Sequence, residues 1–341
     1  MKEKIMTLIQ RERNLYILIS VTILTAILFA FIFGNSMYSA RNLQSMAYQI
    51  PEFGFIALAM MLSFMIGGID LSVVANANTA GIFAALILTG VWLPGLNESN
   101  AIIAAVLVAM GASILFGFFN GWMVAKLSAP PLIATLGTMI LYSGIGMALT
   151  GGKGVTGLPS SFTSFGTAEL WGVPLIFVIF VLVAVILSVI LNRMTFGRKI
   201  YLYGGNRIAA RFSAINNERM AIAIFVVIGI LAGIAGLIII SRVNSAKVGY
   251  GDAYLLQSLL VCVIGGIHPD GGRGRAAGVV CAVILMQMLS SAFTILQFSP
   301  YARKLIWGFM LIFVMGLNYL SERRAQKIRV DLLRKRTPQA D

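Results

Sequence analysis

Residues 192–219 read Asn-Arg-Met-Thr-Phe-Gly-Arg-Lys-Ile-Tyr-Leu-Tyr-Gly-Gly-Asn-Arg-Ile-Ala-Ala-Arg-Phe-Ser-Ala-Ile-Asn-Asn-Glu-Arg and form the longest polar interruption between apolar segments of this chain. Arginine and lysine recur along the stretch, and Glu218 is its only acid. In membrane proteins, short loops this basic stay on the cytoplasmic side. The stretch therefore predicts the direction in which every neighbouring apolar segment crosses the bilayer.

Composition is typical of a membrane protein with several spans. Hydrophobic residues make up 59% of the 341 residues and charged residues 11%, against about 45–50% and about 25% in soluble domains. The basic residues behind the net charge of +14 lie between apolar segments, so we expect no nucleic-acid partner. Cys262, Cys281 and the single histidine, His268, show no metal-ligand spacing, and neither a metal nor a cofactor is expected.

The apolar segments predict an all-α polytopic protein with about ten transmembrane helices around a central translocation pathway. Most of the 26 Lys and Arg residues fall in segments that this topology places inside, so both termini are predicted to be cytoplasmic. Residues 34–50 are expected to be a polar external connection. The expected spans are residues 15–33, 51–66, 73–91, 101–125, 132–149, 173–191, 221–240, 253–267, 276–296 and 305–320.

The stretch Gly67-Gly-Ile-Asp-Leu-Ser72 separates two apolar segments and predicts a broken helix. Ile66-Gly-Gly-Ile69 recurs as Ile264-Gly-Gly-Ile267, which suits a transporter with related halves but also arises by chance in a Gly- and Ile-rich chain. Asp70 has apolar sequence on both sides. It is either a functional ionisable residue or a cap for the next helix, and the two roles are compatible.

Two pairs of glycines, Gly117 with Gly121 and Gly229 with Gly233, have the small-xxx-small spacing that allows close helix packing.

Inside the predicted spans, polar side chains are mostly neutral. The chain has no phosphate-binding loop, no His-Glu-x-x-His and no Ser or Cys near a His, so an enzyme is not expected. An ion-coupled transporter would keep more acids in its spans. Neutral donors and acceptors suit a polyhydroxylated solute, and they also join helices. The residues assigned to the solute pathway are Asp70, Asn76, Asn78, Thr135, Thr138 and Gln257.

Within the basic stretch, residues 206–215 predict a short helix with Asn206 as its N-cap. A mixed apolar and basic face exposed to the cytosol suits docking of a protein partner, or contact with anionic lipid headgroups. That face, at spacing i, i+3, i+4 and i+7, carries Ile208, Arg211, Phe212 and Ile215.

Four stretches spread over the chain carry a family pattern. They are Gly67-Gly-Ile-Asp-Leu-Ser-Val73, Ala129-Pro-Pro-Leu-Ile-Ala-Thr-Leu-Gly-Thr138, Thr195-Phe-Gly-Arg198 with Gly204-Gly-Asn-Arg-Ile-Ala-Ala-Arg211, and Gly265-Gly-Ile-His-Pro-Asp-Gly-Gly-Arg-Gly274. Together and in this order they resemble the bacterial ABC importer permeases of the ribose, xylose and galactose type. Val74 departs from the family's usual Gly, and Ala214 departs from its usual Gly-Ile pair, which weakens any transfer of backbone geometry.

The resemblance implies a dimer with a second permease subunit, the same or homologous, in the bacterial cytoplasmic (inner) membrane. It also implies two cytosolic ABC ATPase subunits, which would hydrolyse ATP, and a periplasmic solute-binding protein. Residues 204–215 would hold the coupling helix that fits a groove in the ATPase. The residues assigned to coupling are Gly204, Gly205, Asn206, Ala209, Ala210, Arg211, Phe212 and Ile215.

We therefore predict that residues 1–341 form a single transmembrane permease domain of an ATP-driven importer for a monosaccharide or a similar polyol, with a cytoplasmic coupling loop at 192–219 and a basic cytoplasmic tail at 321–341. The same family resembles carriers of nucleosides and of a furanose-like signalling molecule. The alternative is an ATP-independent secondary transporter or facilitator, which would work in liposomes without an ATPase. A membrane enzyme ranks third because the sequence has no catalytic cluster.

Overall fold

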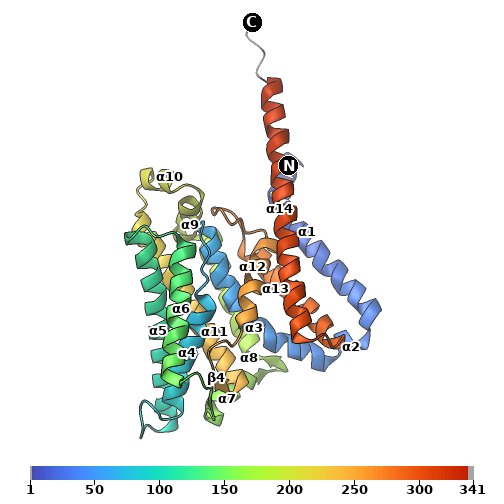
Figure 1. Ribbon diagram of the computed structural model, residues 1–341. Coiled ribbons are helices and arrows are strands. Elements are labelled where there is room, and N and C mark those ends of the chain that lie inside the picture. The colour runs from blue at the N-terminus through green and yellow to red at the C-terminus, as the bar shows by residue number, and fades with distance from the viewer. Residues whose placement is uncertain (1, 337–341) are drawn as a thin grey trace.

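The computed structural model describes residues 2–336. Most of this part is helical, and the long helices run side by side in one bundle (Figure 1). Within it, eight helices are long and apolar enough to cross a membrane, while α4 (Val73–Leu88) and α12 (Asp252–Ile264) are apolar but shorter. The predicted all-α polytopic membrane fold is confirmed, with eight candidate spans among the described helices and two shorter apolar helices at the places of two further predicted spans.

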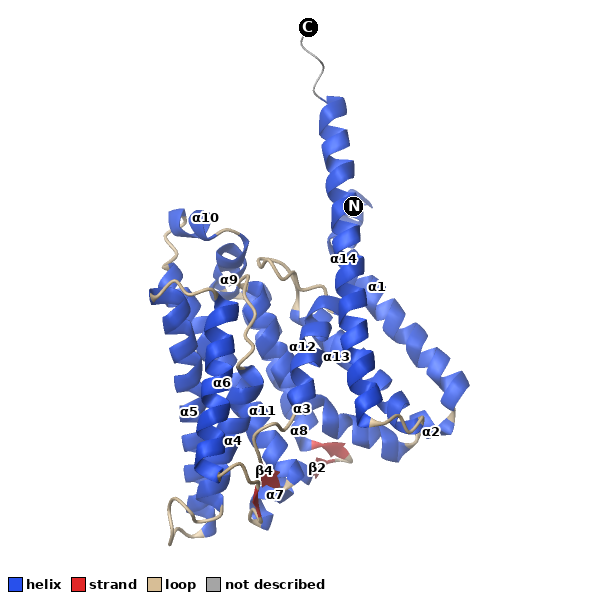
Figure 2. Cartoon of the chain, in the orientation of Figure 1, coloured by secondary structure: helices blue, strands red, loops and turns tan. Residues whose placement is uncertain are grey.

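Short elements connect the long helices. Two antiparallel strand pairs lie at the end of the bundle far from α9 and α10 (Figure 2). The eight long helices are α1 (Lys2–Phe33), α3 (Ala40–Met65), α5 (Glu98–Lys126), α6 (Pro131–Thr150), α8 (Leu175–Arg193), α11 (Asn217–Val243), α13 (Ala276–Ile295) and α14 (Pro300–Arg336). The short helices are α2 (Asn35–Tyr38), α7 (Ser160–Thr167), α9 (Thr195–Gly205) and α10 (Arg207–Phe212). The strand pairs are β1 (Val155–Thr156) with β4 (Ser245–Ala246), and β2 (Glu169–Leu170) with β3 (Val173–Pro174).

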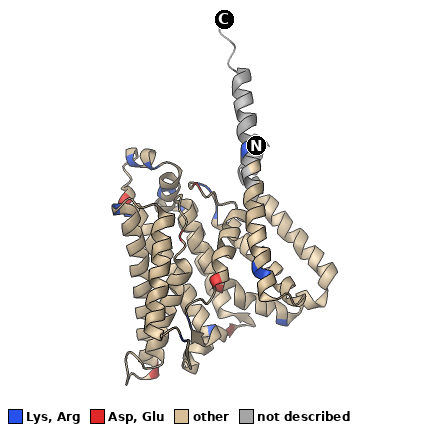
Figure 3. Ribbon diagram, viewed as in Figure 1, with Lys and Arg blue, Asp and Glu red and all other residues tan. Residues whose placement is uncertain are grey.

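The two ends of the bundle differ in charge. Lys and Arg gather at the end that carries α9 and α10 (Figure 3), and this end is called the basic end below. The start of α1 and the last turns of α14 lie on the same side of the bundle (Figure 1). In the expected tail 321–341, residues 321–336 continue α14, and residues 337–341 lie outside the described residues. The basic residues of the basic end include Lys126, Arg193, Arg198, Lys199, Arg207, Arg211, Arg219, Arg273 and Arg275.

Helices α3 and α4 form the centre of the bundle. Nearly every residue of α4, and every residue of α3 from position 50 onward, is buried. A helix that is apolar and buried all round lies inside a protein rather than at its lipid surface. By contrast, most side chains of the apolar parts of α1 and α14 are exposed. The rest of the described chain therefore leaves most of the apolar surface of these two helices uncovered.

The two small-xxx-small patterns face each other where α5 packs on α11. A Cβ atom on Gly117 would lie 3.1 Å from the Cα of Gly229, and one on Gly233 would lie 2.9 Å from the Cβ of Ser113. A Cβ on Gly121 would lie 2.8 Å from the Cα of Ile222. The predicted close approach is confirmed, because glycine lets the two backbones touch where a larger residue would separate them.

The expectation that residues 34–50 form a polar external connection is wrong. Helices α2 and α3 occupy this segment, and α3 continues through Pro51. Its polar side chains find partners inside the bundle: Ser291 Oγ donates to Asn42 Oδ1 (3.0 Å), and Gln287 Nε2 donates to Gln49 Oε1 (3.2 Å). Because α13 satisfies these groups, the helix can be polar there without being an external loop.

The predicted break after α3 is confirmed, and its Gly-Gly turn resembles the one after α12. In each turn a glycine with positive φ donates its N–H to a carbonyl three residues earlier, and the next residue donates to a carbonyl five residues earlier. The glycine is Gly67 (φ 71°) after α3 and Gly266 (φ 76°) after α12. The repeated Ile-Gly-Gly-Ile sequence therefore ends both helices with the same hydrogen-bond motif. The glycine with positive φ is the first of the pair after α3 and the second of the pair after α12.

Candidate functional site

A short exposed helix, α10, lies at the basic end. Asn206 caps it, since its side-chain oxygen accepts the N–H groups of Ile208 (2.9 Å) and Ala209 (3.0 Å); this confirms the predicted cap. Ile208 is 71% exposed and Phe212 is 89% exposed, and Arg211 beside them is also exposed. Large apolar side chains gathered at a solvent-facing turn are typical of an interaction surface.

Helix α10 is shorter than the helix predicted over residues 206–215. It ends at Phe212 because Ala214 adopts a left-handed φ of 57°, which is incompatible with a further helical turn. Ile215 consequently turns inward and is only 8% exposed, so it does not share the exposed face with Arg211. Among the residues assigned to coupling, Gly205, Asn206, Ala209, Arg211 and Phe212 are exposed, Gly204 is half-buried, and Ala210 and Ile215 are buried.

Helix α9 packs on the ends of α3 and of the Gly-rich turn 265–275 through backbone contacts. A Cβ atom on Gly204 would collide with the carbonyl oxygen of Met65 and lie 2.7 Å from the amide nitrogen of Gly272. Gly272 N–H in turn donates to Met65 C=O (2.9 Å). A Cβ on Gly271 would lie 2.7 Å from the amide nitrogen of Gly67. We call this contact of α3, α9 and the turn the glycine junction. It joins the stretch next to α10 directly to the broken helix.

Two tyrosines of α9 strengthen its attachment. Tyr201 Oη donates to the carbonyl oxygen of Gly274 (2.8 Å), and the guanidinium of Arg207 lies 5.2 Å from the ring centroid of Tyr203. Burial raises the pKa of both tyrosine hydroxyl groups above their ordinary value. The Tyr201 hydroxyl therefore stays protonated and remains a donor.

In the interior, Asp70 belongs to a buried hydrogen-bond chain that joins α4, α5 and α6. Asp70 Oδ1 accepts the N–H (2.8 Å) and the hydroxyl (2.6 Å) of Ser72. Ser72 Oγ accepts from Asn120 Nδ2 (2.7 Å), and Tyr142 Oη donates to Asn120 Oδ1 (3.2 Å). Ser72 holds the N-cap position of α4, so Asp70 supports that helix start from two residues upstream.

Two other residues assigned to the pathway also join helices, and a third bonds within its own helix. Thr135 Oγ1, on α6, accepts the N–H of Leu71 (3.1 Å) at the broken helix. On α4, Asn76 binds Ser113 of α5 twice: its Nδ2 donates to the backbone oxygen (3.2 Å), and its Oδ1 accepts from the hydroxyl (2.7 Å). Thr138 Oγ1 donates to the Thr135 carbonyl one turn earlier (3.3 Å). These side chains are used in packing.

Asn78 on α4 and Gln257 on α12 differ from the other residues assigned to the pathway. Asn78 is buried and Gln257 is half-buried, and neither side chain makes a hydrogen bond with any other residue in the described part of the chain. Helices α4 and α12 contact each other in the bundle. Both amides therefore have donors and acceptors that no other described residue uses.

Replacing Asp70 with alanine is expected to lower solute uptake by about tenfold while expression changes little, because the start of α4 loses its buried acceptor. Asp70→Asn keeps an acceptor for Ser72 and is expected to retain more uptake than Asp70→Ala. The measurement is uptake per membrane-inserted protein for both variants. Unchanged uptake in Asp70→Ala would show that the Asp70 carboxylate is not required for transport.

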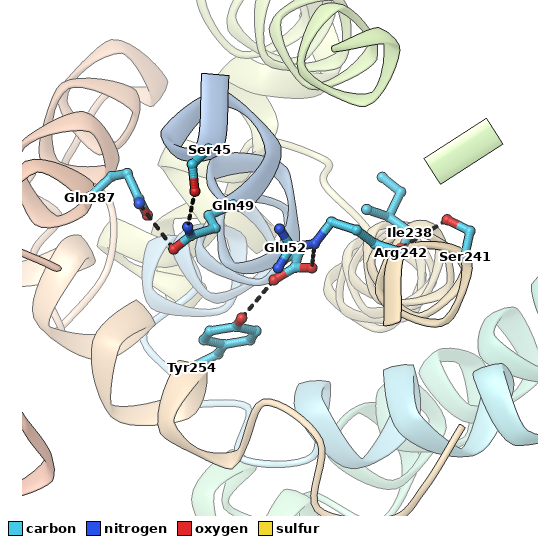
Figure 4. Close-up of polar contacts among 8 residues, drawn as sticks. All are labelled: Ser45, Gln49, Glu52, Ile238, Ser241, Arg242, Tyr254 and Gln287. Carbon is cyan, nitrogen blue, oxygen red and sulfur yellow. Dashed lines mark hydrogen bonds and ion pairs between the residues drawn. The ribbon is translucent and has the colours of Figure 1, made fainter. Parts of the chain in front are cut away.

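A buried charged cluster that the sequence interpretation missed lies where α3, α11 and α12 meet. Figure 4 shows Glu52 between Arg242 and Tyr254. Glu52 forms an ion pair with Arg242, and one carboxylate oxygen accepts from Tyr254 Oη (2.7 Å). The Glu52 side chain is only 3% exposed and that of Arg242 27%. One turn before Glu52, Gln49 continues the polar contacts toward α13 through Gln287 (3.2 Å).

The predicted spans do not reveal the cluster because both charges lie beside span ends. Glu52 is the second residue of the predicted span 51–66, and Arg242 lies just beyond the end of the predicted span 221–240. The available signal was that Arg242 follows a 20-residue apolar run, 221–240, and that an isolated acid lies far from it in the chain. A charge in such a setting calls for a partner.

Comparisons with known proteins relate the chain to membrane permeases. A family model described as branched-chain amino acid transport system / permease component matches residues 42–315. The chain is 32% identical over 290 residues to the ribose import permease protein RbsC of Bacillus subtilis, over 84% of this chain and 87% of that protein. It is 32% identical over 281 residues to the L-arabinose transport system permease protein AraH of Escherichia coli (82% and 83%). It is 30% identical over 260 residues to the autoinducer 2 import system permease protein LsrC of Yersinia enterocolitica (76% and 70%). No solved structure matches the chain.

Proposed function

Because this chain belongs to the branched-chain amino acid transport system / permease component family, we propose that it forms the membrane pathway of an ATP-driven importer for a monosaccharide or a similar small polyhydroxylated solute. The observation that carries the proposal is the near full-length similarity to permeases named for ribose and L-arabinose import. The chain is a transport subunit and not an enzyme. An ATP-independent facilitator is not supported by these relatives.

Two observations support the proposed class of solute: the polar groups of the interior and the solutes for which the relatives are named. The free amides of Asn78 and Gln257 suit the hydroxyl groups of a neutral sugar, because each amide offers both donors and an acceptor. The similarity to LsrC, named for autoinducer 2 import, keeps a furanose-like signalling molecule as a second candidate solute. A nucleoside is a third candidate solute, although none of the relatives reported above is named for nucleoside import.

The proposal includes the partners that such an importer needs. These are a second permease subunit, two cytosolic ABC ATPase subunits and a periplasmic solute-binding protein, with the chain in the bacterial inner membrane. Its single transmembrane domain, 1–341, would have the basic end and both termini in the cytoplasm, which the gathering of Lys and Arg at that end supports (Figure 3).

Coupling is assigned to α10 and its link to the bundle. The exposed side chains of Ile208 and Phe212 offer an apolar anchor, and Arg211 adds charge beside it. The glycine junction ties α9 to the end of α3 and to the turn 265–275. ATP binding in the partner would move α10 and α9, and the differential affinity of the two states for the solute would complete the cycle.

The test is ATP-driven uptake in proteoliposomes that contain the chain, its co-purified ATPase and its binding protein. Arg211→Ala/Phe212→Asp is expected to lower ATP-driven uptake more than tenfold, because truncation of a docking anchor costs about 2 kcal/mol or more. ATP hydrolysis by the ATPase should persist without stimulation by solute. The binding protein identifies the solute by a ligand screen.

The matched control is Arg193→Ala/Met194→Asp, which also removes one arginine and replaces one large apolar side chain by Asp. Its two residues are exposed and are the last residue of α8 and the residue that follows it. This control is expected to keep uptake near wild type. Coupled uptake that survives in Arg211→Ala/Phe212→Asp would remove α10 from the docking role. Purification of the chain alone, active in liposomes without ATP, would overturn the importer itself.

A further inference from the structure

A cavity of about 800 Å³ opens at the basic end beside α9. Its volume is within the range of small-molecule sites, roughly 300–1,000 Å³. The residues around it come from α1, α8, α9, the turn 265–275 and the start of α13. The glycine junction borders this cavity through Gly272, but none of the functions assigned above places a ligand in it. We call it the basic cavity.

The described lining of the basic cavity is positively charged. Arg198, Arg273 and Arg275 contribute guanidinium groups, and His268 adds an imidazole. No carboxylate belongs to the lining among the residues that the structure describes. A carboxylate oxygen of Asp270 lies 3.6 Å from His268 Nδ1, but the Asp270 side chain is 89% exposed and does not belong to the lining. Such a lining favours an anion.

Two of these arginines carry most of the argument. Arg198 on α9 and Arg273 on the turn are both exposed, and neither forms an ion pair with a carboxylate of the described chain. Guanidinium groups bind phosphate through a planar fork of N–H donors. With one arginine on each side, the cavity is suited to hold one phosphate group between α9 and the turn.

The position of the cavity relative to the apolar surface decides the source of that phosphate. Leu15 lines it and is the residue at which the apolar part of α1 begins. Leu191 and Asn192 line it where the apolar run of α8 ends. Because the lining includes the ends of two apolar segments as well as arginines, we infer that the cavity lies at the level where the hydrocarbon core gives way to the headgroup layer.

We propose that the basic cavity binds the phosphate headgroup of an anionic phospholipid from the membrane leaflet at the basic end. Basic pockets between transmembrane helices at the cytoplasmic face are suited to anionic headgroups. The bound phosphate would bridge Arg198 of α9 and Arg273 of the turn, the two segments that also meet at the glycine junction. Anionic lipid would thereby stiffen the link between the coupling segment and the bundle.

The experiment uses the purified full-length chain in mild detergent after exchange into mixed phosphatidylglycerol and phosphatidylcholine. Native mass spectrometry then counts the lipids that stay bound. The wild-type chain is expected to retain phosphatidylglycerol in preference to phosphatidylcholine. Each arginine removed should weaken retention about fivefold, so Arg198→Gln/Arg273→Gln should weaken it about 25-fold, and Arg198→Lys/Arg273→Lys should keep most of it.

The matched control is Arg193→Gln/Lys199→Gln, which removes two charges from the same region outside the cavity lining. Equal loss in this control, or unchanged retention in Arg198→Gln/Arg273→Gln, would overturn the proposal. Displacement of the lipid by inorganic phosphate or glycerol 3-phosphate at millimolar concentration would assign the site to a soluble anion instead. Lipid retention needs no transport, so this test is independent of the proposed solute.

Discussion

Gly204→Ala is expected to reduce ATP-driven uptake by at least about tenfold, while Gly205→Ala leaves uptake near wild type. At Gly204 the added Cβ would collide with the Met65 carbonyl oxygen and lie 2.7 Å from the amide nitrogen of Gly272. Neither atom belongs to a flexible side chain, so α9 must move off the end of α3. Overpacking of this kind costs about 1–3 kcal/mol or more, and each 1.4 kcal/mol corresponds to tenfold.

Gly205 is the natural control because it is the next residue of the same helix. The closest atom to its added Cβ would be the Cα of Gly272 at 3.9 Å, an ordinary contact. Alanine also has the higher helix propensity. Uptake in proteoliposomes and the melting temperature of each purified variant are the two measurements. Equal uptake in the two variants would mean that the glycine junction is not required for transport.

Breaking the Glu52–Arg242 pair on one side is expected to destabilise the protein more than removing both charges. Arg242→Met leaves the carboxylate of Glu52, which is 3% exposed, with only the Tyr254 hydroxyl as a donor. Loss of one partner of a buried pair costs about 3–5 kcal/mol. The double variant Glu52→Gln/Arg242→Met removes the uncompensated charge and should recover much of that loss. Glu52→Gln alone should cost less than Arg242→Met, because Arg242 is partly exposed at 27%.

The Lys126–Glu218 pair provides the reference, since both side chains are about half exposed. Removing Lys126 should change stability by less than about 1 kcal/mol. Thermal unfolding of the purified variants in one detergent ranks all of them on the same scale. A double variant as unstable as Arg242→Met alone would show that the loss comes from packing and not from the stranded charge.

The fold could be predicted from the sequence wherever a local signal was sufficient. The spacing of Gly117 with Gly121 and of Gly229 with Gly233 predicted close packing of two helices without indicating their partners, and Asn206 predicted the start of α10. An asparagine cap acts through the nearest backbone, so its effect does not depend on distant segments. A glycine pair indicates only that another backbone comes close, and for Gly117 that backbone belongs to Gly229 of α11.

Segments whose structure depends on distant partners could not be predicted. Residues 34–50 are helical because α13 satisfies Asn42 and Gln49 from more than 230 residues away. The same holds for Glu52, whose partner Arg242 is on another helix. A single sequence records the polar residue but not the group that will face it. Polar residues were therefore assigned to loops and membrane edges.

The end of α10 illustrates a second kind of failure. Alanine is a strong helix former, so the helix was expected to run through Ala214 to Ile215. Ala214 instead has a φ of 57°, a conformation that costs an L-residue roughly 1–2 kcal/mol. The resemblance had already marked this position as one where the family usually carries a Gly-Ile pair. That departure was the usable signal, because glycine adopts positive φ without this cost.

The glycine junction also has a mechanical meaning. Between Met65, Gly204 and Gly272 the main chains touch directly, with no rotatable side chain to absorb a displacement. A displacement of α9 would therefore be passed to the end of α3 almost undiminished, because close-packed atoms transmit strain instead of absorbing it. We therefore expect the end of α3, α9 and the turn 265–275 to move as one rigid unit, which the glycines at their contact make possible.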